Sequence, residues 1–188
     1  MNFFCLAAPS FERVRRTLLA AGVLLLSACA ALQSPSDPLA DLLHLIDQRL
    51  AIGEAVARNK WNSGAPIEDP AREREIIDAI GTQAAAHYLE PAFAKDFFRA
   101  QIEASKIVQR ARFAQWAAAA QPPFDDPPDL QRDIRPQLDR LTMAMLAALA
   151  QAMPALGTSG ANARLAAHAS DAAHAAALAP LKKTALQD

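Results

Sequence analysis

Apolar residues recur at helical spacing along much of the chain, and the first long stretch shows the pattern clearly. From Leu39 to Trp61, apolar side chains fall at intervals of three or four positions, which predicts one long amphipathic helix ending near Gly64. The preceding Asp37-Pro38 pair predicts where this helix starts, because aspartate is a favoured helix cap and proline fits the first helical turn.

The same combination of an acidic residue and a proline marks two further helices. Asp69-Pro70 predicts the start of a second helix that runs toward Ala86. Glu90-Pro91 predicts the start of a third, whose apolar face extends through several phenylalanines and a tryptophan. The first half of the domain is therefore predicted to consist of three consecutive helices.

The second half of the chain continues the helical pattern after one interruption. The proline-rich segment 121–128 predicts a loop, because proline stops a helix. Apolar positions within 138–149 predict a fourth helix, and the alanine-rich tail from Asn162 onward predicts one or two more. Alternating β-branched runs are nearly absent, so we expect an all-α fold in which a single domain, residues 38–188, forms a bundle of about five to six helices.

The first 28 residues have the features of an export signal. Three arginines precede the apolar run 18–26, which is too short to span a bilayer as a stable helix. Segment 26–29, Leu-Ser-Ala-Cys, is similar to a bacterial lipoprotein cleavage box, so Cys29 is predicted to become the lipidated first residue of a periplasmic protein. A competing interpretation is ordinary signal-peptidase cleavage after Ala30, which would release a soluble secreted protein.

Composition narrows the function classes. Residues 29–37 are small and polar enough to be a tether. The only cysteines are Cys5 and Cys29, so no disulfide is expected in the folded domain. Cleavage before Cys29 would remove three arginines and one glutamate, change the net charge from −1 to −3, and leave 160 of the 188 residues. We therefore expect no nucleic-acid partner and no membrane contact apart from the lipid anchor.

Six polar residues project from the three predicted helices at spacings that place them on shared faces. The two cations of the first helix are eleven positions apart, close to three turns, so they point to the same side. The pair on the third helix is spaced i, i+4 and shares one face. The six residues are Arg49, Lys60, Arg72, Glu73, Ser105 and Gln109.

This pattern, with Asp69 preceding Arg72-Glu73, resembles the all-helical (AroQ-type) chorismate mutases over roughly residues 38–150. Lys60-Trp61, the following segment 66–69 and the long C-terminal extension are similar to the secreted gamma subclass. The resemblance implies an isomerase of aromatic amino acid biosynthesis. Such an enzyme rearranges chorismate to prephenate without a cofactor, metal or covalent intermediate.

The resemblance also implies roles for individual side chains. Lys60 and Gln109 are expected to stabilise the ether oxygen of chorismate, which gains negative charge as its C–O bond breaks. Glu73 would accept a hydrogen bond from the ring hydroxyl, with Asp69 supporting that region. Ser105 would donate to a carboxylate.

Arginines are expected to hold the two carboxylates and so fix the folded-over, reactive shape of the substrate. Arg49 and Arg72 are two of them, and together with the other cations they predict a positively charged pocket. The secreted subclass implies a further arginine from the fourth helix, for which Arg135 is the candidate. Pro136 is expected to bias Arg135 away from helical geometry, which leaves Arg132 as an alternative.

Other chemistry has weaker support. The spacing of His44, His87, His168 and His174 is not that of a metal site, and the domain contains no cysteine ligand, so no metal is expected. The alternative function is a non-catalytic helical envelope lipoprotein that acts as an interaction module. Because dimers are common in the subclass that the chain resembles, a homodimer is a further expectation.

Overall fold

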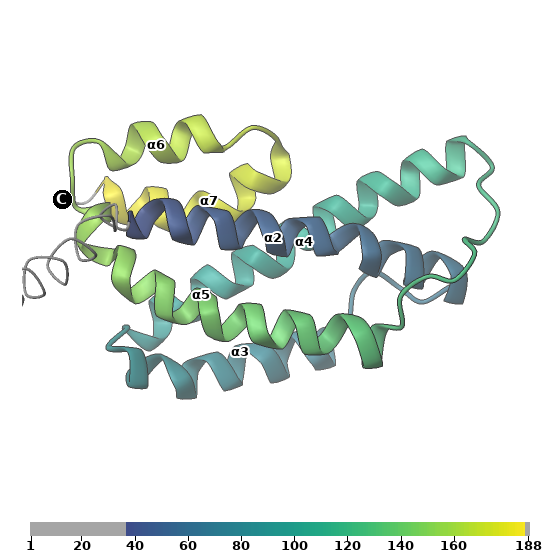
Figure 1. The fold of residues 1–188 in the computed structure, drawn as a ribbon, viewed down its shortest axis with the longest axis horizontal. Coiled ribbons are helices and arrows are strands. Elements are labelled where there is room, and N and C mark those ends of the chain that lie inside the picture. Colours follow the sequence, from purple (N-terminus) through teal and green to yellow (C-terminus); the bar gives the residue numbers. More distant parts are fainter. Residues whose placement is uncertain (1–36, 187–188) are drawn as a thin grey trace, which may run out of the picture. The chain divides into compact units, whose positions relative to one another are not determined.

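The structure, a computed structural model, describes residues 37–186. Over this range the chain folds into six α-helices, with no β-strand (Figure 1). This confirms the predicted all-α fold class. The predicted export signal 1–28, the lipidation site Cys29 and all but the last residue of the tether lie outside the described residues.

The helices follow the predicted order, and the tail forms two of them. Their bounds are α2 (Pro38–Ser63), α3 (Pro70–Ala84), α4 (Pro91–Ala118), α5 (Arg135–Leu156), α6 (Ala161–His168) and α7 (Ala172–Ala185). A 3-10 turn, η2 (Ala85–His87), follows α3, and a π-helix, η3 (Leu130–Ile134), precedes α5. Helix α2 packs against α4 and α5, α3 packs against α4, and α7 packs against α4 and α6. Within residues 37–186, no helix is both long and apolar enough to cross a membrane.

The first three helices begin where their local sequence predicts, and α2 also ends as predicted. The carboxylates of Asp37, Asp69 and Glu90 accept hydrogen bonds from N–H groups of the following helical turns at 2.6 to 3.2 Å. Each of these residues precedes a proline in the first turn, where the missing N–H costs no helical hydrogen bond. Helix α2 ends at Gly64, whose φ of 66° lies in the left-handed region that glycine adopts without steric strain.

Aliphatic and phenylalanine side chains from all six helices form the main core. Leu42, Phe98 and Leu149 are among its fully buried members. Phe97 and Phe98 contact each other edge to face, with ring centroids 5.2 Å apart. This core packs the N-terminal half of α2 against α4, α5 and α7. The C-terminal half of α2 makes different contacts.

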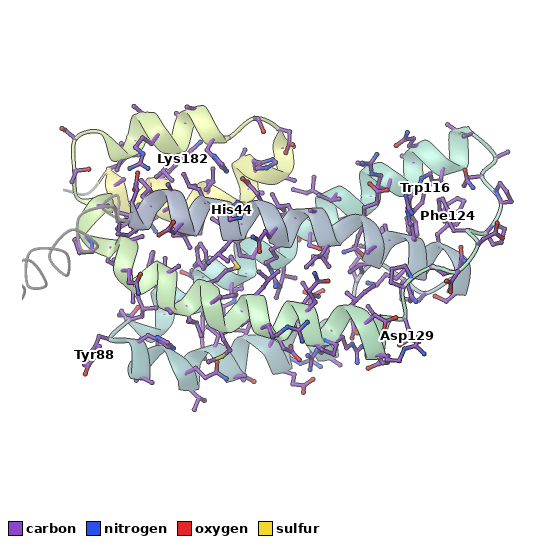
Figure 2. The ribbon with its side chains drawn as sticks, viewed as in Figure 1. His44, Tyr88, Trp116, Phe124, Asp129 and Lys182 are labelled. Atoms are coloured by element: carbon purple, nitrogen blue, oxygen red, sulfur yellow. The ribbon has the colours of Figure 1, made fainter. Side chains whose placement is uncertain are left out.

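An aromatic cluster joins the C-terminal ends of α2 and α4 to the loop that follows α4. Trp116 lies between Trp61 and Phe124, with ring centroids 5.7 and 4.8 Å away, and Figure 2 shows Trp116 beside Phe124. The side chain of Asn62 donates to the Phe124 carbonyl and accepts from the Phe124 N–H, both at 2.8 Å. The proline-rich loop is thereby tied to α2 rather than left free.

The start of α5 differs from expectation. Arg135 has helical geometry (φ −58°, ψ −45°), so the prediction that Pro136 biases it away from that geometry was wrong. The π-helix η3 explains the difference, since the N–H of Arg135 bonds to the Leu130 carbonyl across a wider turn. Pro136 then lies in the first turn of α5, where its ring and missing N–H are tolerated.

Candidate active site

A cavity of about 290 Å³ opens between α2, α3, α4 and the η3–α5 segment. Apolar side chains such as Val56, Ile80 and Ile102 form part of its wall. All eight side chains predicted to bind the substrate also line it. They are Arg49, Lys60, Asp69, Arg72, Glu73, Ser105, Gln109 and Arg135.

Arg49 projects into the cavity from the middle of α2. It is only 5% exposed, and its Nε and Nη1 atoms have no hydrogen-bond partner among the described residues. Burial lowers the pKa of its guanidinium to about 10, and the nearby Asp139 partly offsets that effect. A buried cation whose donors are unpaired carries a desolvation cost that an anion entering the cavity would relieve.

Lys60 lies on the same side of α2, near its C-terminal end, and is 9% exposed. Its ammonium donates to the carbonyl of Ile67 in the loop between α2 and α3. Burial lowers the pKa of Lys60, while the carboxylates of Asp69, Glu68 and Glu73 act in the opposite direction. An ammonium has three donors, so one hydrogen bond to the loop leaves others for a ligand.

Helix α4 contributes Ser105 and Gln109, which lie one turn apart. Gln109 is 4% exposed; its Nε2 donates to Ser105 Oγ at 3.2 Å, and its Oε1 has no partner. The close approach of α2 to this part of α4 depends on Gly53, since a Cβ there would lie 3.2 Å from the Val108 side chain and 3.5 Å from Ser105 Oγ. Gly53 therefore brings the two polar walls of the cavity together.

Helix α3 supplies Arg72 and Glu73 from its first turn. The guanidinium of Arg72 contacts Glu75 at 2.8 Å and Asp139 at 3.4 Å, and both carboxylates are mostly exposed. Glu73 Oε1 accepts from the N–H of Asp69 at 3.3 Å, while the Asp69 side chain caps the same helix. The two acidic residues are thus both fixed at the helix N-terminus, in an arrangement similar to a capping box but with the glutamate one position later.

Lys106, Glu75 and Asp139 also line the cavity and were missed. Lys106 contacts Glu73 at 3.2 Å and Glu103 at 3.1 Å. Burial disfavours its ammonium, but the hydrogen bonds to Glu103 and Glu73 prevail and raise the pKa of Lys106. Lys106 stands three residues before Gln109, so helical spacing could have found it. Nothing in the sequence distinguishes Glu75 or Asp139 from other helix-surface acids.

These additions lower the predicted positive charge of the pocket. Five cationic and four carboxylate side chains line the cavity, so its net charge is only weakly positive. Most of the carboxylates lie at the exposed rim, whereas Arg49 and Lys60 are buried. The positive charge is therefore concentrated in the interior of the cavity.

The structure also separates the two candidate arginines of the fourth helix. Arg135 lines the cavity, and its Nη2 lies 4.0 Å from Asp69 Oδ2 across the opening. The side chain of Arg132 is 79% exposed, pairs with the neighbouring Asp133, and is not among the residues that line the cavity. Geometry thus favours Arg135 over Arg132.

Comparison with known proteins identifies the family of the chain. Residues 40–110 match the family model for chorismate mutase type II. The chain is 36% identical over 121 residues to the secreted chorismate mutase of Mycolicibacterium smegmatis, a match that covers 64% of this chain and 66% of that protein. It is 33% identical over 145 residues to the secreted chorismate mutase of Mycobacterium tuberculosis, covering 71% of each. The chain belongs to the chorismate mutase family.

Solved chorismate mutases share the fold. The crystal structure from Burkholderia thailandensis matches with a TM-score of 0.71 and 38% identity, covering 78% of this chain and 99% of that one. The structure from Burkholderia phymatum matches with a TM-score of 0.69 and 27% identity, covering 79% and 96%. These likenesses confirm the all-helical type and, through the relatives named as secreted, the predicted subclass.

Proposed function

We propose that this protein converts chorismate to prephenate in the cavity around Arg49. In this rearrangement the ether C–O bond breaks while a C–C bond forms, and no atom enters or leaves the molecule. Because the electrons reorganise within one molecule, the reaction needs neither a nucleophile nor a cofactor. The observation that carries the proposal is the buried, unpaired guanidinium of Arg49 in a cavity that seven other predicted binding residues also line.

Binding of the dianion is assigned to the arginines and Ser105. Arg49 would pair with one carboxylate deep in the cavity, where low exposure strengthens a charge-assisted hydrogen bond. Arg72 and Arg135, nearer the opening, would hold the second carboxylate. Holding both carboxylates selects the folded-over conformer of chorismate. Most of the conformational entropy is then lost on binding rather than in the chemical step. Ser105 supplies a neutral donor beside them.

Lys60 and Gln109 are assigned to stabilise the negative charge that develops on the ether oxygen. As the C–O bond lengthens, the ether oxygen becomes negative, and donors already in place stabilise that state more than the ground state. Lys60 keeps donors free beyond its bond to Ile67, and the Gln109 amide has a second N–H beyond the one shared with Ser105. A rate increase of about 10⁶ requires roughly 8 kcal/mol, which several such contacts supply jointly.

Glu73 and Asp69 complete the assignment. Glu73 would accept from the ring hydroxyl of chorismate, and Lys106 keeps its carboxylate in position from the neighbouring helix. Asp69 would act through Glu73, since its side chain caps the helix that carries Glu73 and its backbone N–H donates to the Glu73 carboxylate.

Direct turnover tests the proposal. Protein that lacks residues 1–29 is expected to consume chorismate and release prephenate, identified by NMR. Lys60→Met is expected to abolish turnover while circular dichroism stays unchanged, and Lys183→Met, at an exposed position of α7, serves as the matched control. Folded wild-type protein that leaves chorismate intact would sink the proposal and favour the non-catalytic interaction module.

We further infer that the enzyme acts outside the cytoplasm. Relatives from three organisms are named secreted, and the first 28 residues have the features of an export signal. Fractionation of cells that produce the wild type or Cys29→Ser distinguishes lipidation at Cys29 from cleavage after Ala30. Loss of membrane association in the variant supports lipidation and a periplasmic, anchored enzyme. A soluble wild type supports cleavage after Ala30.

A homodimer stays a prediction. Because all eight predicted binding residues come from one chain, we expect turnover per chain to be independent of protein concentration. To check this, turnover per chain is measured at protein concentrations above and below the one at which size-exclusion chromatography detects dissociation.

A further inference from the structure

Away from the cavity, three side chains from distant parts of the chain converge beside the α6–α7 turn. Asp47 comes from α2, His168 is the last residue of α6, and His174 lies in the first turn of α7. One potential metal-ligating atom from each lies within 4.8 Å of the others. All three side chains are partly buried, with exposed fractions of 41%, 27% and 22%. None of the three lines the cavity.

The hydrogen bonds of His174 leave a mismatch that a cation would resolve. Its Nδ1 lies 2.9 Å from the Asp171 carboxylate, and its Nε2 lies 3.4 Å from Asp47 Oδ1. A neutral imidazole carries one N–H, and an ionised carboxylate only accepts. With the proton on Nδ1, the lone pair of Nε2 faces Asp47, and either a second ring proton or a metal ion bound to Nε2 would make this arrangement favourable.

We propose that Asp47, His168 and His174 form a binding site for a divalent transition-metal ion of the Zn²⁺ class, which joins the α6–α7 turn to α2. Two imidazole nitrogens, one carboxylate oxygen and a water would complete the four-coordinate sphere that Zn²⁺ prefers. His168 Nε2 and His174 Nε2 both face the same oxygen, Asp47 Oδ1, at 2.7 and 3.4 Å.

The distances suit a metal after a small adjustment. Ligands about 2.0–2.2 Å from a tetrahedral ion lie roughly 3.3–3.5 Å from one another. The Asp47–His174 distance of 3.4 Å already matches, and the Asp47–His168 distance of 2.7 Å requires a shift of less than about 1 Å.

A second shell for the metal is already in place. Ligating histidines usually donate their other N–H to a carboxylate, which fixes the tautomer and the ring orientation. Asp171 has this relation to His174 and is itself held as the cap of α7, where its Oδ1 accepts from the His174 N–H at 2.9 Å. The cap therefore directs Nε2 of His174 toward Asp47.

Zinc binding to the mature protein tests the site. EDTA-washed protein titrated with ZnCl₂ is expected to bind one ion per chain with a Kd below about 1 µM, and the Tm should rise by roughly 5–10 °C once Zn²⁺ exceeds Kd by about 100-fold. Co²⁺ in place of Zn²⁺ should show the intense visible absorption of a tetrahedral site. Chorismate turnover should not depend on EDTA, because none of the three ligands lines the cavity.

Variants assign the ligands. His168→Gln and His174→Gln should each weaken Zn²⁺ binding at least tenfold and remove the Tm rise, and Asp47→Asn should do the same. The control is His44→Gln on α2. Within residues 37–186, the side chain of His44, labelled in Figure 2, has Gln48 one turn away as its only hydrogen-bond partner. Binding weaker than about 10 µM, binding that survives both histidine variants, or a weak octahedral Co²⁺ spectrum would overturn the proposal and leave a hydrogen-bonded His–Asp cluster.

Discussion

Helix α4 carries two buried glutamines, Gln101 and Gln109, in two different regions of the molecule. Gln101 is fully buried in the core against α7, where its Nε2 donates to the Ala177 carbonyl at 2.9 Å. Gln109 lies two turns further along and faces the cavity with Arg49. Gln101 is hydrogen-bonded to the backbone of a neighbouring helix, whereas Gln109 shares a cavity with charged side chains such as Arg49 and Lys60.

Unpaired polar atoms are more frequent at the cavity but also occur in the core. Among the residues that the structure describes, five buried side-chain nitrogen or oxygen atoms have no partner. Four belong to Arg49, Gln83 and Gln109, which line the cavity, and the fifth is Oε1 of Gln101 in the core. Each unpaired group costs about 1–3 kcal/mol. We therefore expect the cavity region to contribute less to stability than the core region.

The largest contrast is expected between Arg49→Met and Leu42→Ala, two changes on α2. Arg49→Met should lower kcat/KM by at least about 10³-fold, since it removes a charged contact in a dry site, and should leave the free energy of unfolding unchanged or higher. Leu42→Ala should lower the free energy of unfolding by about 2–5 kcal/mol and leave turnover per folded molecule unchanged. Steady-state kinetics and urea unfolding measure both. An Arg49→Met protein that is active, or as unstable as Leu42→Ala, would erase the contrast.

The two glutamines provide the next test. Gln109→Met should reduce kcat by about 10²-fold, because an amide donor to the ether oxygen is lost. Gln101→Met has a similar volume change and should leave kcat within about twofold, with a stability change of less than about 1.5 kcal/mol. If both variants lowered kcat equally, the loss in Gln109→Met would come from replacing a buried amide and not from losing a contact with the substrate.

A smaller effect is expected at the start of α5. Arg135→Ala should raise KM and lower kcat/KM by about 10- to 100-fold, because it removes one charge-assisted contact near the opening. Arg132→Ala should change kcat/KM by less than about twofold, since the exposed guanidinium of Arg132 forms an ion pair with the neighbouring Asp133 and does not line the cavity. Wild-type activity in both variants would remove the fourth-helix arginine from the site.

The smallest expected effect is the pH dependence of kcat/KM, which is absent near neutral pH. Lys60 acts as an ammonium, and burial lowers its pKa from the ordinary 10.5, so kcat/KM should fall tenfold per pH unit above an apparent pKa that is lower than 10.5. The bound dianion favours the charged form, so kcat should begin to fall at higher pH. Lys60→Arg should move this limb to a different pH, and Lys183→Met should leave it in place. A limb that stays at the wild-type pH in Lys60→Arg would assign the titration to Arg49, whose pKa burial lowers to about 10.

The amino-acid sequence alone was sufficient wherever the cause is local. The acidic residue and proline before α2, α3 and α4 mark their starts because a cap and a fixed φ act within one turn. The cavity residues of α2 and α4 were placed on the correct faces because 3.6-residue periodicity orients every side chain of a regular helix. The sequence named Arg135 as a candidate but predicted its backbone geometry wrongly, since the π-helix before Pro136 has no simple sequence signature.

Contacts between distant segments required the folded chain. Asp47 and His168 are 121 residues apart and yet lie 2.7 Å from each other, so no spacing rule links them. The rim carboxylates Glu75 and Asp139, and the different surroundings of Gln101 and Gln109, likewise follow only from how the helices pack. Helical periodicity determines which way a side chain points. Only tertiary packing determines what it meets there and how much water it loses, and those two quantities decide whether a polar residue is a structural contact or part of a binding site.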